Sequence, residues 1–194
     1  MSSSDTARSI LAAARLLLDE GGTDAISMRK VAEKVGVTAM AIYRHFPDRE
    51  ALLNALADQG FAEVANALLA RVPPGPVLEG MDAVIEVYLD FGLGHPHLFE
   101  LMFLASRPGA RQFPQDFQSG LSPTANLFAD MLRRGIAEGL FRADEDIWEI
   151  TFETGALMQG LIMLFLGGRI GLDAEGFRGL VRRSLRRYIN GIRA

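Results

Sequence analysis

Apolar residues recur three or four positions apart along most of the chain, which is the period of an amphipathic α-helix. The first such stretch ends at Gly21-Gly22, and its apolar side comprises Ile10, Leu11, Ala14, Leu17 and Leu18. No segment shows the strict alternation of apolar and polar residues that marks a half-buried strand. The pattern therefore predicts an all-α protein of roughly nine helices.

Two short helices are predicted between residues 27 and 45, separated by the sequence VGV. Ser27 and Thr38 suit the first position of each, because a hydroxyl can accept a hydrogen bond from a backbone N–H of the first turn. Gly36 suits the turn, since it lacks the Cβ that resists a left-handed backbone. Apolar pairs that can staple each helix start are Ile26 with Val31 and Val37 with Ile42. The second helix, from Thr38 to His45, has barely two turns and would be marginal alone.

Longer helices follow. One begins after Pro47-Asp48 and is broken by the sequence RVPPGP at 71–76. A boundary near its start gives two domains, residues 1–50 and 51–194. The second domain contains a helix that starts at Pro96, a Pro- and Gly-rich loop at 106–123, and three further helices. Their predicted limits are Pro123 to about Glu138, Asp144 to about Leu166, and a last helix capped by Asp173.

Composition narrows the possible functions. The 194 residues carry a net charge of −4 and include no cysteine, which excludes disulfides, thiolate metal sites and a cysteine nucleophile. The start lacks the basic and apolar run of a signal peptide, and the longest uncharged segment, Thr154 to Gly168, has only 15 residues. We therefore expect a cytoplasmic protein without a membrane partner. No nucleophile elbow, phosphate-binding glycine loop or clustered ligand set indicates an enzyme or a cofactor.

Two short capped helices joined by a glycine turn are typical of a helix-turn-helix, whose second helix enters the major groove of DNA. Residues 27–49 contain five basic and two acidic side chains, a local charge of +3 in an acidic chain. Phosphate contacts supply much of the affinity of such proteins for DNA. Charge alone leaves a second interpretation open, namely a solvated helix surface.

The stretch ISMRKVAEKVGVTAMAIYRHFPDREALL resembles the N-terminal signature of TetR/AcrR-type transcriptional regulators. The resemblance covers roughly the first fifty residues, and the remainder matches in helical layout. It implies an N-terminal three-helix DNA-binding unit and a C-terminal helical bundle for ligand binding and dimerisation. It also implies a homodimer on a palindromic double-stranded operator, with a small-molecule effector and repression as the family default.

Carried onto this sequence, the resemblance implies specific DNA contacts. Ala39, Met40 and Arg44 would face base edges, with methyl contacts to thymine and an arginine contact to guanine. The expected phosphate-contacting or helix-capping residues are Ser27, Arg29, Lys30, Thr38, Tyr43, His45 and Arg49. Two alternatives remain: Met40 can be a helix-packing residue, and His45 can serve only to support Phe46, which we expect in the core.

The family places its dimer interface on the last two helices. The residues expected there are Gly155, Met158, Ile162, Phe165, Leu180, Leu185 and Tyr188. The alternative is that this apolar surface is core within one chain. The expected ligand pocket is lined by Tyr88, Phe91, Met102, Phe103, Phe128, Met131, Trp148 and Phe152. Few charges fall among them, so the effector is expected to be apolar or aromatic, although such a stripe can also be ordinary core.

Three further features have competing interpretations. His95 and His97 lie two residues apart at a helix start and do not share a face, so capping or pocket roles are favoured over a metal site. The RRSLRR run at 182–187 is interpreted as a solvated helix C-terminus that the helix dipole favours, against a second basic patch. For the whole chain, the alternative to a DNA-binding regulator is a helical protein-interaction module.

Overall fold

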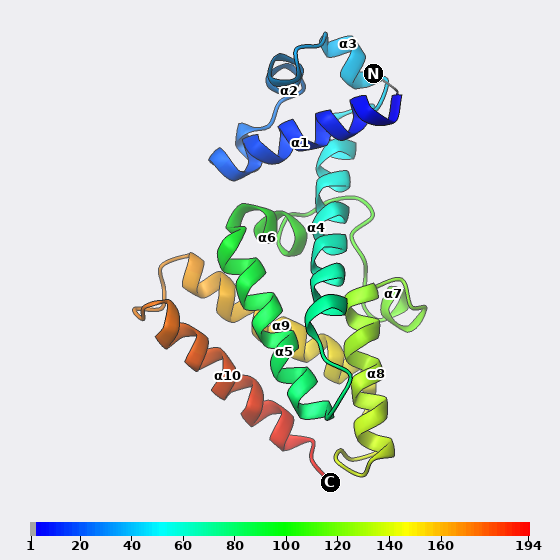
Figure 1. Ribbon diagram of the computed structural model, residues 1–194, viewed down its shortest axis with the longest axis vertical. Helices are drawn as coiled ribbons and strands as arrows, with labels where there is room; N and C mark the ends of the chain where they lie inside the picture. The colour runs from blue at the N-terminus through cyan, green and yellow to red at the C-terminus, as the bar shows by residue number, and fades with distance from the viewer. Residues whose placement is uncertain (1–2) are drawn as a thin grey trace. The chain divides into compact units, whose positions relative to one another are not determined.

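The computed structural model describes residues 3–194 and is all-helical over that range (Figure 1). It contains ten α-helices and one short 3₁₀ turn, η1 (Thr23–Ala25). The α-helices are α1 (Ser3–Gly21), α2 (Met28–Val35), α3 (Ala39–Tyr43), α4 (Arg49–Arg71), α5 (Val77–Gly94), α6 (Pro96–Phe103), α7 (Gln115–Gln118), α8 (Pro123–Ala137), α9 (Ile147–Leu166) and α10 (Ala174–Gly191). The all-α prediction is confirmed, and the additional helix is the four-residue α7 inside the predicted loop.

The chain forms two compact units. The first comprises Met1–Glu63 and Gly94–Ala110, and the second comprises Val64–Leu93 and Arg111–Ala194. Helix α6 therefore packs in the first unit, where it contacts α1, although it lies well beyond residue 50 in the sequence. The predicted functional boundary at residue 50 remains a prediction.

A glycine explains how α6 reaches the N-terminal helices. A Cβ at Gly60 of α4 would lie 2.5 Å from the Met102 sulfur and 3.0 Å from a methyl of Leu98. Glycine at this position lets the two helices approach closely, because a larger residue would have to displace Met102 and Leu98. Leu98 and Phe99 of α6 are fully buried.

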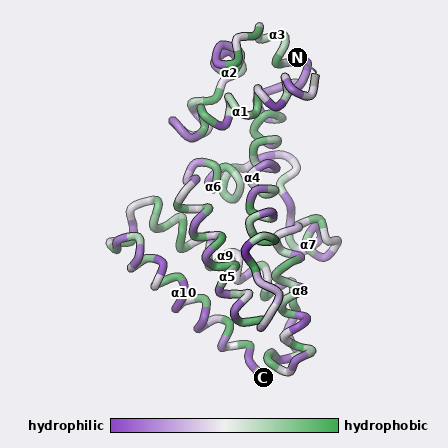
Figure 2. Tube along the Cα trace, viewed as in Figure 1, coloured by the Kyte–Doolittle hydropathy of each residue, from purple (hydrophilic) through white to green (hydrophobic). Residues whose placement is uncertain are grey.

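The second unit is built from packed helix pairs, α8 with α9 and α9 with α10. Phe165 of α9 stacks on Phe177 of α10 with ring centroids 4.1 Å apart. Figure 2 shows α10 alternating between hydrophobic and hydrophilic positions, as expected for a helix with one buried side. Its buried residues are Phe177, Val181, Leu185 and Ile189.

Two helix limits differ from the predictions. Helix α3 ends at Tyr43, and Arg44 and His45 continue as a turn. Helix α9 starts at Ile147 and not at Asp144, because the carboxylate of Asp146 accepts hydrogen bonds from two N–H groups of the first turn. Asp144 and Glu145 instead pair with Arg142 in the preceding loop.

Candidate nucleic-acid interface

The segment between α2 and α3 has the caps and the turn that the sequence predicts. Ser27 Oγ accepts a hydrogen bond from the Lys30 N–H at 3.2 Å, and Thr38 Oγ1 accepts one from the Ala41 N–H at 3.3 Å. Gly36 adopts a left-handed backbone with φ of 77° and ends α2. Both hydroxyls act as acceptors here, so each keeps its own hydrogen to donate to a ligand such as a phosphate.

Helix α3 has one buried side chain. Ile42 is fully buried, whereas Met40 is 69% exposed and Tyr43 is 47% exposed. Arg44, in the turn after α3, is also exposed. We call Ala39, Met40, Tyr43 and Arg44 the reading face. The alternative that Met40 packs against another helix is wrong for this chain, because its side chain lies largely in solvent.

His45 and Phe46 follow the reading face and are both half-buried. The expectation that Phe46 lies in the core is therefore only partly met, because its side chain keeps some exposure. The amide of each donates to the carbonyl of Ile42, so the chain turns tightly out of α3. This turn separates the reading face from the first residues of α4, which are capped by Asp48 through a 2.7 Å hydrogen bond to the Ala51 N–H.

Two of the five basic residues in this region have protein partners. Arg49 donates to the carbonyls of Ile26 at 2.9 Å and Thr23 at 2.5 Å, so it fixes the turn before α2. Lys34 pairs with Glu20 at 2.8 Å.

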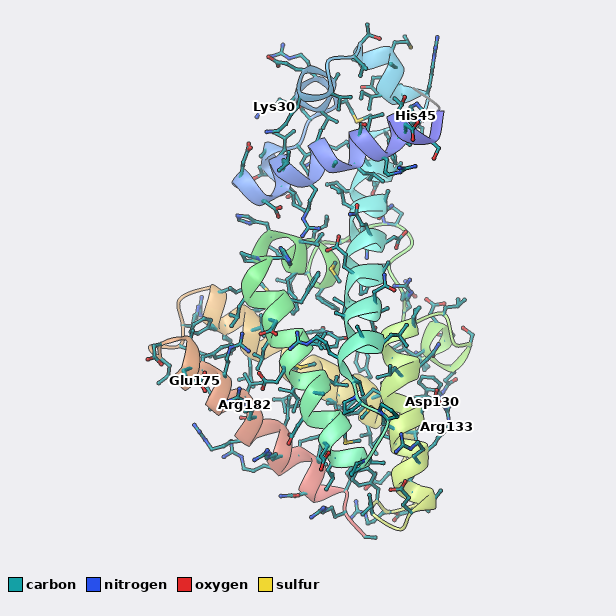
Figure 3. All side chains as sticks on the ribbon, viewed as in Figure 1. Lys30, His45, Asp130, Arg133, Glu175 and Arg182 are labelled. Carbon is teal, nitrogen blue, oxygen red and sulfur yellow. The ribbon has the colours of Figure 1, made fainter. Side chains whose placement is uncertain are left out.

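The other three basic residues, Arg29, Lys30 and Arg44, are exposed, and their side chains make no hydrogen bond or ion pair within residues 3–194. Figure 3 shows Lys30 on the surface of α2. Exposed cations without protein partners, beside a capped short helix, can contact the phosphate backbone of DNA.

The eight expected pocket residues fall in both units. Met102 and Phe103 belong to the first, where Phe103 contacts the rings of Phe61 and Phe99. The other six belong to the second unit. Among them, Phe91, Phe128 and Met131 are buried, and Trp148 is half-buried with the Arg133 guanidinium 5.3 Å from its ring.

Polar groups lie among these apolar side chains of the second unit. Burial raises the pKa of Tyr88, and a hydrogen bond with Thr124 partly offsets that effect. The hydroxyl oxygen of Thr154 is buried and has no hydrogen-bond partner within residues 3–194. Such an unsatisfied group is rare and calls for an explanation.

Phe152 differs from the other expected pocket residues. Its side chain is 42% exposed, and it stacks on Phe113 with centroids 4.5 Å apart, beside Phe117. We therefore assign it to the surface of α9, because a residue of this exposure does not line an enclosed cavity.

The residues expected at the dimer interface fall into two groups, one buried and one partly exposed. Met158, Ile162 and Leu185 are at most 3% exposed and belong to the core of the single chain, so they offer no surface to a second copy. The others, Gly155, Phe165, Leu180 and Tyr188, keep partial exposure. The Tyr188 hydroxyl donates to the Glu153 carboxylate, which joins α10 to α9.

An apolar strip on α9 includes Leu164, which was not predicted from the sequence. Exposed positions four residues apart are Phe152, Ala156, Gly160 and Leu164. Leu164 is 46% exposed, and no heavy atom outside its immediate surroundings in α9 lies within 4 Å of a Cβ built on Gly160. The spacing of four residues between these apolar positions in the sequence could have indicated this strip. By length and composition α9 could also cross a membrane, with 28% of that stretch buried, although core helices of globular proteins share this composition.

An ion-pair ladder in the second unit was not predicted from the sequence. It joins three acidic residues of α5 to three arginines of α10: Asp82 to Arg186 at 2.8 Å, Glu86 to Arg182 at 2.6 Å, and Asp90 to Arg178 at 2.6 Å. Figure 3 marks Arg182 on α10, together with Glu175, which also contacts it. Half of the RRSLRR arginines are therefore paired with α5, which corrects the interpretation of that run as a purely solvated end.

The ladder changes the protonation of its acids. The hydrogen bond from Arg182 is the main reason why the pKa of Glu86 lies below its ordinary value of 4.5, and Arg178 adds to the effect. Burial alone would raise the pKa of Asp90, but Arg178 and Arg71 outweigh it and lower that pKa. Both carboxylates are thus charged over the neutral pH range.

His97 lies against Gly22, since a Cβ on that glycine would be 3.4 Å from its Nδ1. His95 precedes the first residue of α6 and makes no side-chain cap bond there. Within residues 3–194 no group of three or more His, Asp or Glu side chains is arranged to hold a metal ion.

Comparison with known proteins gives matches along most of the chain. Residues 10–56 match the family described as "Bacterial regulatory proteins, tetR family", and residues 81–188 match "Tetracyclin repressor-like, C-terminal domain". A tetracycline repressor protein of class A from transposon 1721 of Escherichia coli is 30% identical over 156 residues. That match covers 77% of this chain and 64% of the relative's length.

Solved structures show the same fold. A Rhodococcus sp. RHA1 protein of unknown function is 28% identical with a TM-score of 0.78, over 97% of this chain and 95% of that one. The regulator FadR of Bacillus subtilis, in complex with stearoyl-CoA, has a TM-score of 0.76 over 95% of this chain and 98% of its own. Its identity is 19%, so this likeness concerns the fold alone.

Proposed function

Because the chain belongs to the TetR family of bacterial regulatory proteins, we propose that it is a ligand-responsive transcriptional repressor that binds a palindromic operator as a homodimer. The observation that carries the proposal is the reading face of α3 and the turn after it, where Met40, Tyr43 and Arg44 are exposed and Arg44 makes no hydrogen bond or ion pair within residues 3–194. Met40 and Ala39 supply methyl contacts, and Arg44 reads guanine. Arg29 and Lys30 bind phosphates, and the capping hydroxyls of Ser27 and Thr38 add weaker contacts.

Two roles are refined by the geometry. Arg49 uses two of its five N–H donors on backbone carbonyls, so its contribution to DNA binding is first to fix the turn before α2. His45 is half-buried and supports the turn that follows the reading face. Tyr43 contacts a phosphate through its hydroxyl.

A dimer supplies the second reading face. Two such helices on one face of a duplex stand roughly 34 Å apart, one helical turn. The surface we assign to the dimer is the exposed side of α9 and α10: Phe152, Gly155, Ala156, Gly160, Leu164, Phe165, Leu180 and Tyr188. A second copy, and not lipid, covers this apolar strip in our proposal, because the open space at Gly160 admits a close helix.

The effector site lies in the helical bundle. The half-buried Tyr88, the buried Thr124 and the unsatisfied Thr154 provide polar contacts among apolar side chains, which suits an apolar or aromatic molecule with one or two polar atoms. The relatives bind varied molecules, among them minocycline in an Acinetobacter baumannii protein and stearoyl-CoA in the Bacillus subtilis one. Effector binding shifts the population towards a conformer that no longer fits the operator, with residues 61–70 of α4 as the moving segment.

The test is selection of genomic fragments by the purified protein, followed by fluorescence anisotropy on the best duplex at two salt concentrations. Tyr43→Ala should weaken binding to every duplex, and Tyr43→Phe, which removes only the hydroxyl, should lose part of that affinity. Affinity that falls steeply with salt supports phosphate contacts. Wild-type protein that selects no fragment, or Tyr43→Ala with full affinity, would refute the proposal and favour a protein-interaction module.

A further inference from the structure

A groove opens at the end of the ion-pair ladder, between α5 and α10. Its volume is about 270 Å³. The lining residues are Leu78, Met81, Asp82 and Ile85 from α5, and Leu185, Arg186, Ile189, Asn190 and Arg193 from α10 and the residues after it. We call this the α5–α10 groove. None of the residues expected to line the effector pocket belongs to it, so it is a separate site.

The ion-pair ladder ends at the groove. Its three pairs advance by four residues along each helix in opposite directions, from Asp90 with Arg178 to Asp82 with Arg186. The next pair in that register is Leu78 with Asn190, which carries no charge. The ionic contact between the helices therefore stops at Asp82, and beyond it apolar side chains face a space that no ion pair fills.

The charges around the groove are unequal. Asp82 is neutralised by Arg186, whose Nη2 lies 2.8 Å from its carboxylate. Arg193 is exposed, and its guanidinium forms no ion pair within residues 3–194. Its backbone is nevertheless held, because it forms an isolated bridge with Phe141. The groove thus has an apolar floor, one balanced pair and one cation without a partner.

We propose that the α5–α10 groove binds a small amphiphilic anion, with a short apolar body on the floor and a carboxylate held by Arg193 and Asn190. A guanidinium favours a carboxylate because it can donate two parallel hydrogen bonds. The volume lies just below the usual range of ligand sites, about 300–1,000 Å³, which restricts the occupant to a molecule the size of a medium-chain carboxylate. The bound carboxylate lies near Leu78 and Asn190, where a fourth ion pair of the ladder would fall if these two residues were charged.

The test is isothermal titration calorimetry of the full chain with sodium octanoate, with octan-1-ol and octylammonium as neutral and cationic probes of the same length. We expect saturable octanoate binding and at least fivefold weaker binding of both other probes. Arg193→Gln should weaken octanoate binding about tenfold, because it removes the cation and leaves the apolar floor intact. Arg187→Gln is the matched control, since Arg187 lies on α10 outside the groove and its guanidinium hydrogen-bonds Ser184.

A second variant tests the location. Leu78→Trp fills the groove from a half-buried position and should abolish binding, while circular dichroism reports whether the variant folds. Methyl NMR signals of Ile85, Leu185 and Ile189 should shift on octanoate addition. The proposal is overturned by octanoate affinity unchanged in Arg193→Gln, by octylammonium binding as well as octanoate, or by no binding at millimolar concentration. None of these results bears on operator binding, which rests on other residues.

Discussion

Arginines occupy two regions of this molecule, and their surroundings differ. On α10, Arg178, Arg182 and Arg186 each face a carboxylate of α5 at 2.6 to 2.8 Å. Arg44 of the reading face and Arg29 of α2 have no such partner within residues 3–194. The first set joins two helices of the fold, and the second set is available to bind DNA phosphates and bases in the proposed function. Counting basic residues in the sequence does not distinguish the two sets of arginines. They differ in whether a carboxylate lies opposite the guanidinium.

The two regions also differ in how they are stabilised. Helix α3 depends on a hydroxyl cap, a glycine turn and the burial of Ile42, whereas the α5–α10 pair combines a buried apolar side with the ladder. A helix of five residues has no stability of its own. The following predictions test this comparison, starting with the largest effect.

Ile42→Ala removes the single buried side chain of α3. We expect a loss of about 2–5 kcal/mol in the free energy of unfolding of the first unit, from the lost apolar burial and the cavity left behind. Urea unfolding followed by circular dichroism measures it. Met40→Ala on the same helix is the control and should change stability by less than about 0.5 kcal/mol, because Met40 is exposed. Equal effects of the two variants would contradict the assigned faces of α3.

Arg44→Gln and Arg178→Gln should have opposite consequences. Arg44→Gln should weaken binding to the selected duplex by about 1–3 kcal/mol and leave unfolding unchanged, because its guanidinium has no partner in the part of the chain that the structure describes. Arg178→Gln should lower stability and leave the intrinsic affinity for DNA unchanged, since it serves Glu86 and Asp90. Anisotropy and urea unfolding on both variants decide this. An Arg44→Gln variant that loses stability but keeps its DNA affinity would reverse the assignment.

Glu86→Gln should destabilise the second unit by about 1–2 kcal/mol, because Glu86 accepts charge-assisted hydrogen bonds from two arginines and is only partly exposed. Asp130→Asn is the matched control. Its ion pair with Arg133 lies on the exposed surface of α8, as Figure 3 shows, and its loss should cost less than about 0.5 kcal/mol. Similar losses in the two variants would show that the ladder behaves as an ordinary surface pair.

Acid should weaken the ladder by a smaller amount. The pKa of Glu86 is lowered in the folded chain, so its contribution is present above the ordinary value of 4.5 and is lost as the pH falls through the lower, folded value. Asp90 acts in the same direction. Urea midpoints between about pH 7 and pH 3 should fall less steeply in Glu86→Gln than in the wild type. Parallel profiles would exclude Glu86 as a source of this pH dependence.

Local signals in the sequence predicted much of the fold. Ser27, Thr38, Gly36 and Asp173 each act through neighbours in the chain, and the structure confirms the cap or turn predicted at each. The exact limits of α3 and α9 depend on hydrogen bonds that compete over two or three residues, which composition does not resolve.

Features that depend on distant partners were not predicted. The ladder requires α5 and α10 to lie antiparallel in one register, and nothing near Arg182 in the sequence indicates Glu86. The burial of Met158, Ile162 and Leu185 likewise depends on which side of each helix faces the bundle. The DNA contacts, the dimer surface and the effector pocket remain predictions, since each involves a molecule outside this chain.

The single buried position of α3 has a consequence for how regulators of this design diversify. Met40, Tyr43 and Arg44 are all exposed, so substitutions at these positions leave Ile42, the Thr38 cap and the Gly36 turn in place. Under the proposed function, mutations that change the recognised base sequence would therefore be largely uncoupled from mutations that affect folding. Gene duplicates would then acquire new target promoters by single substitutions while their scaffold stays under unchanged selection.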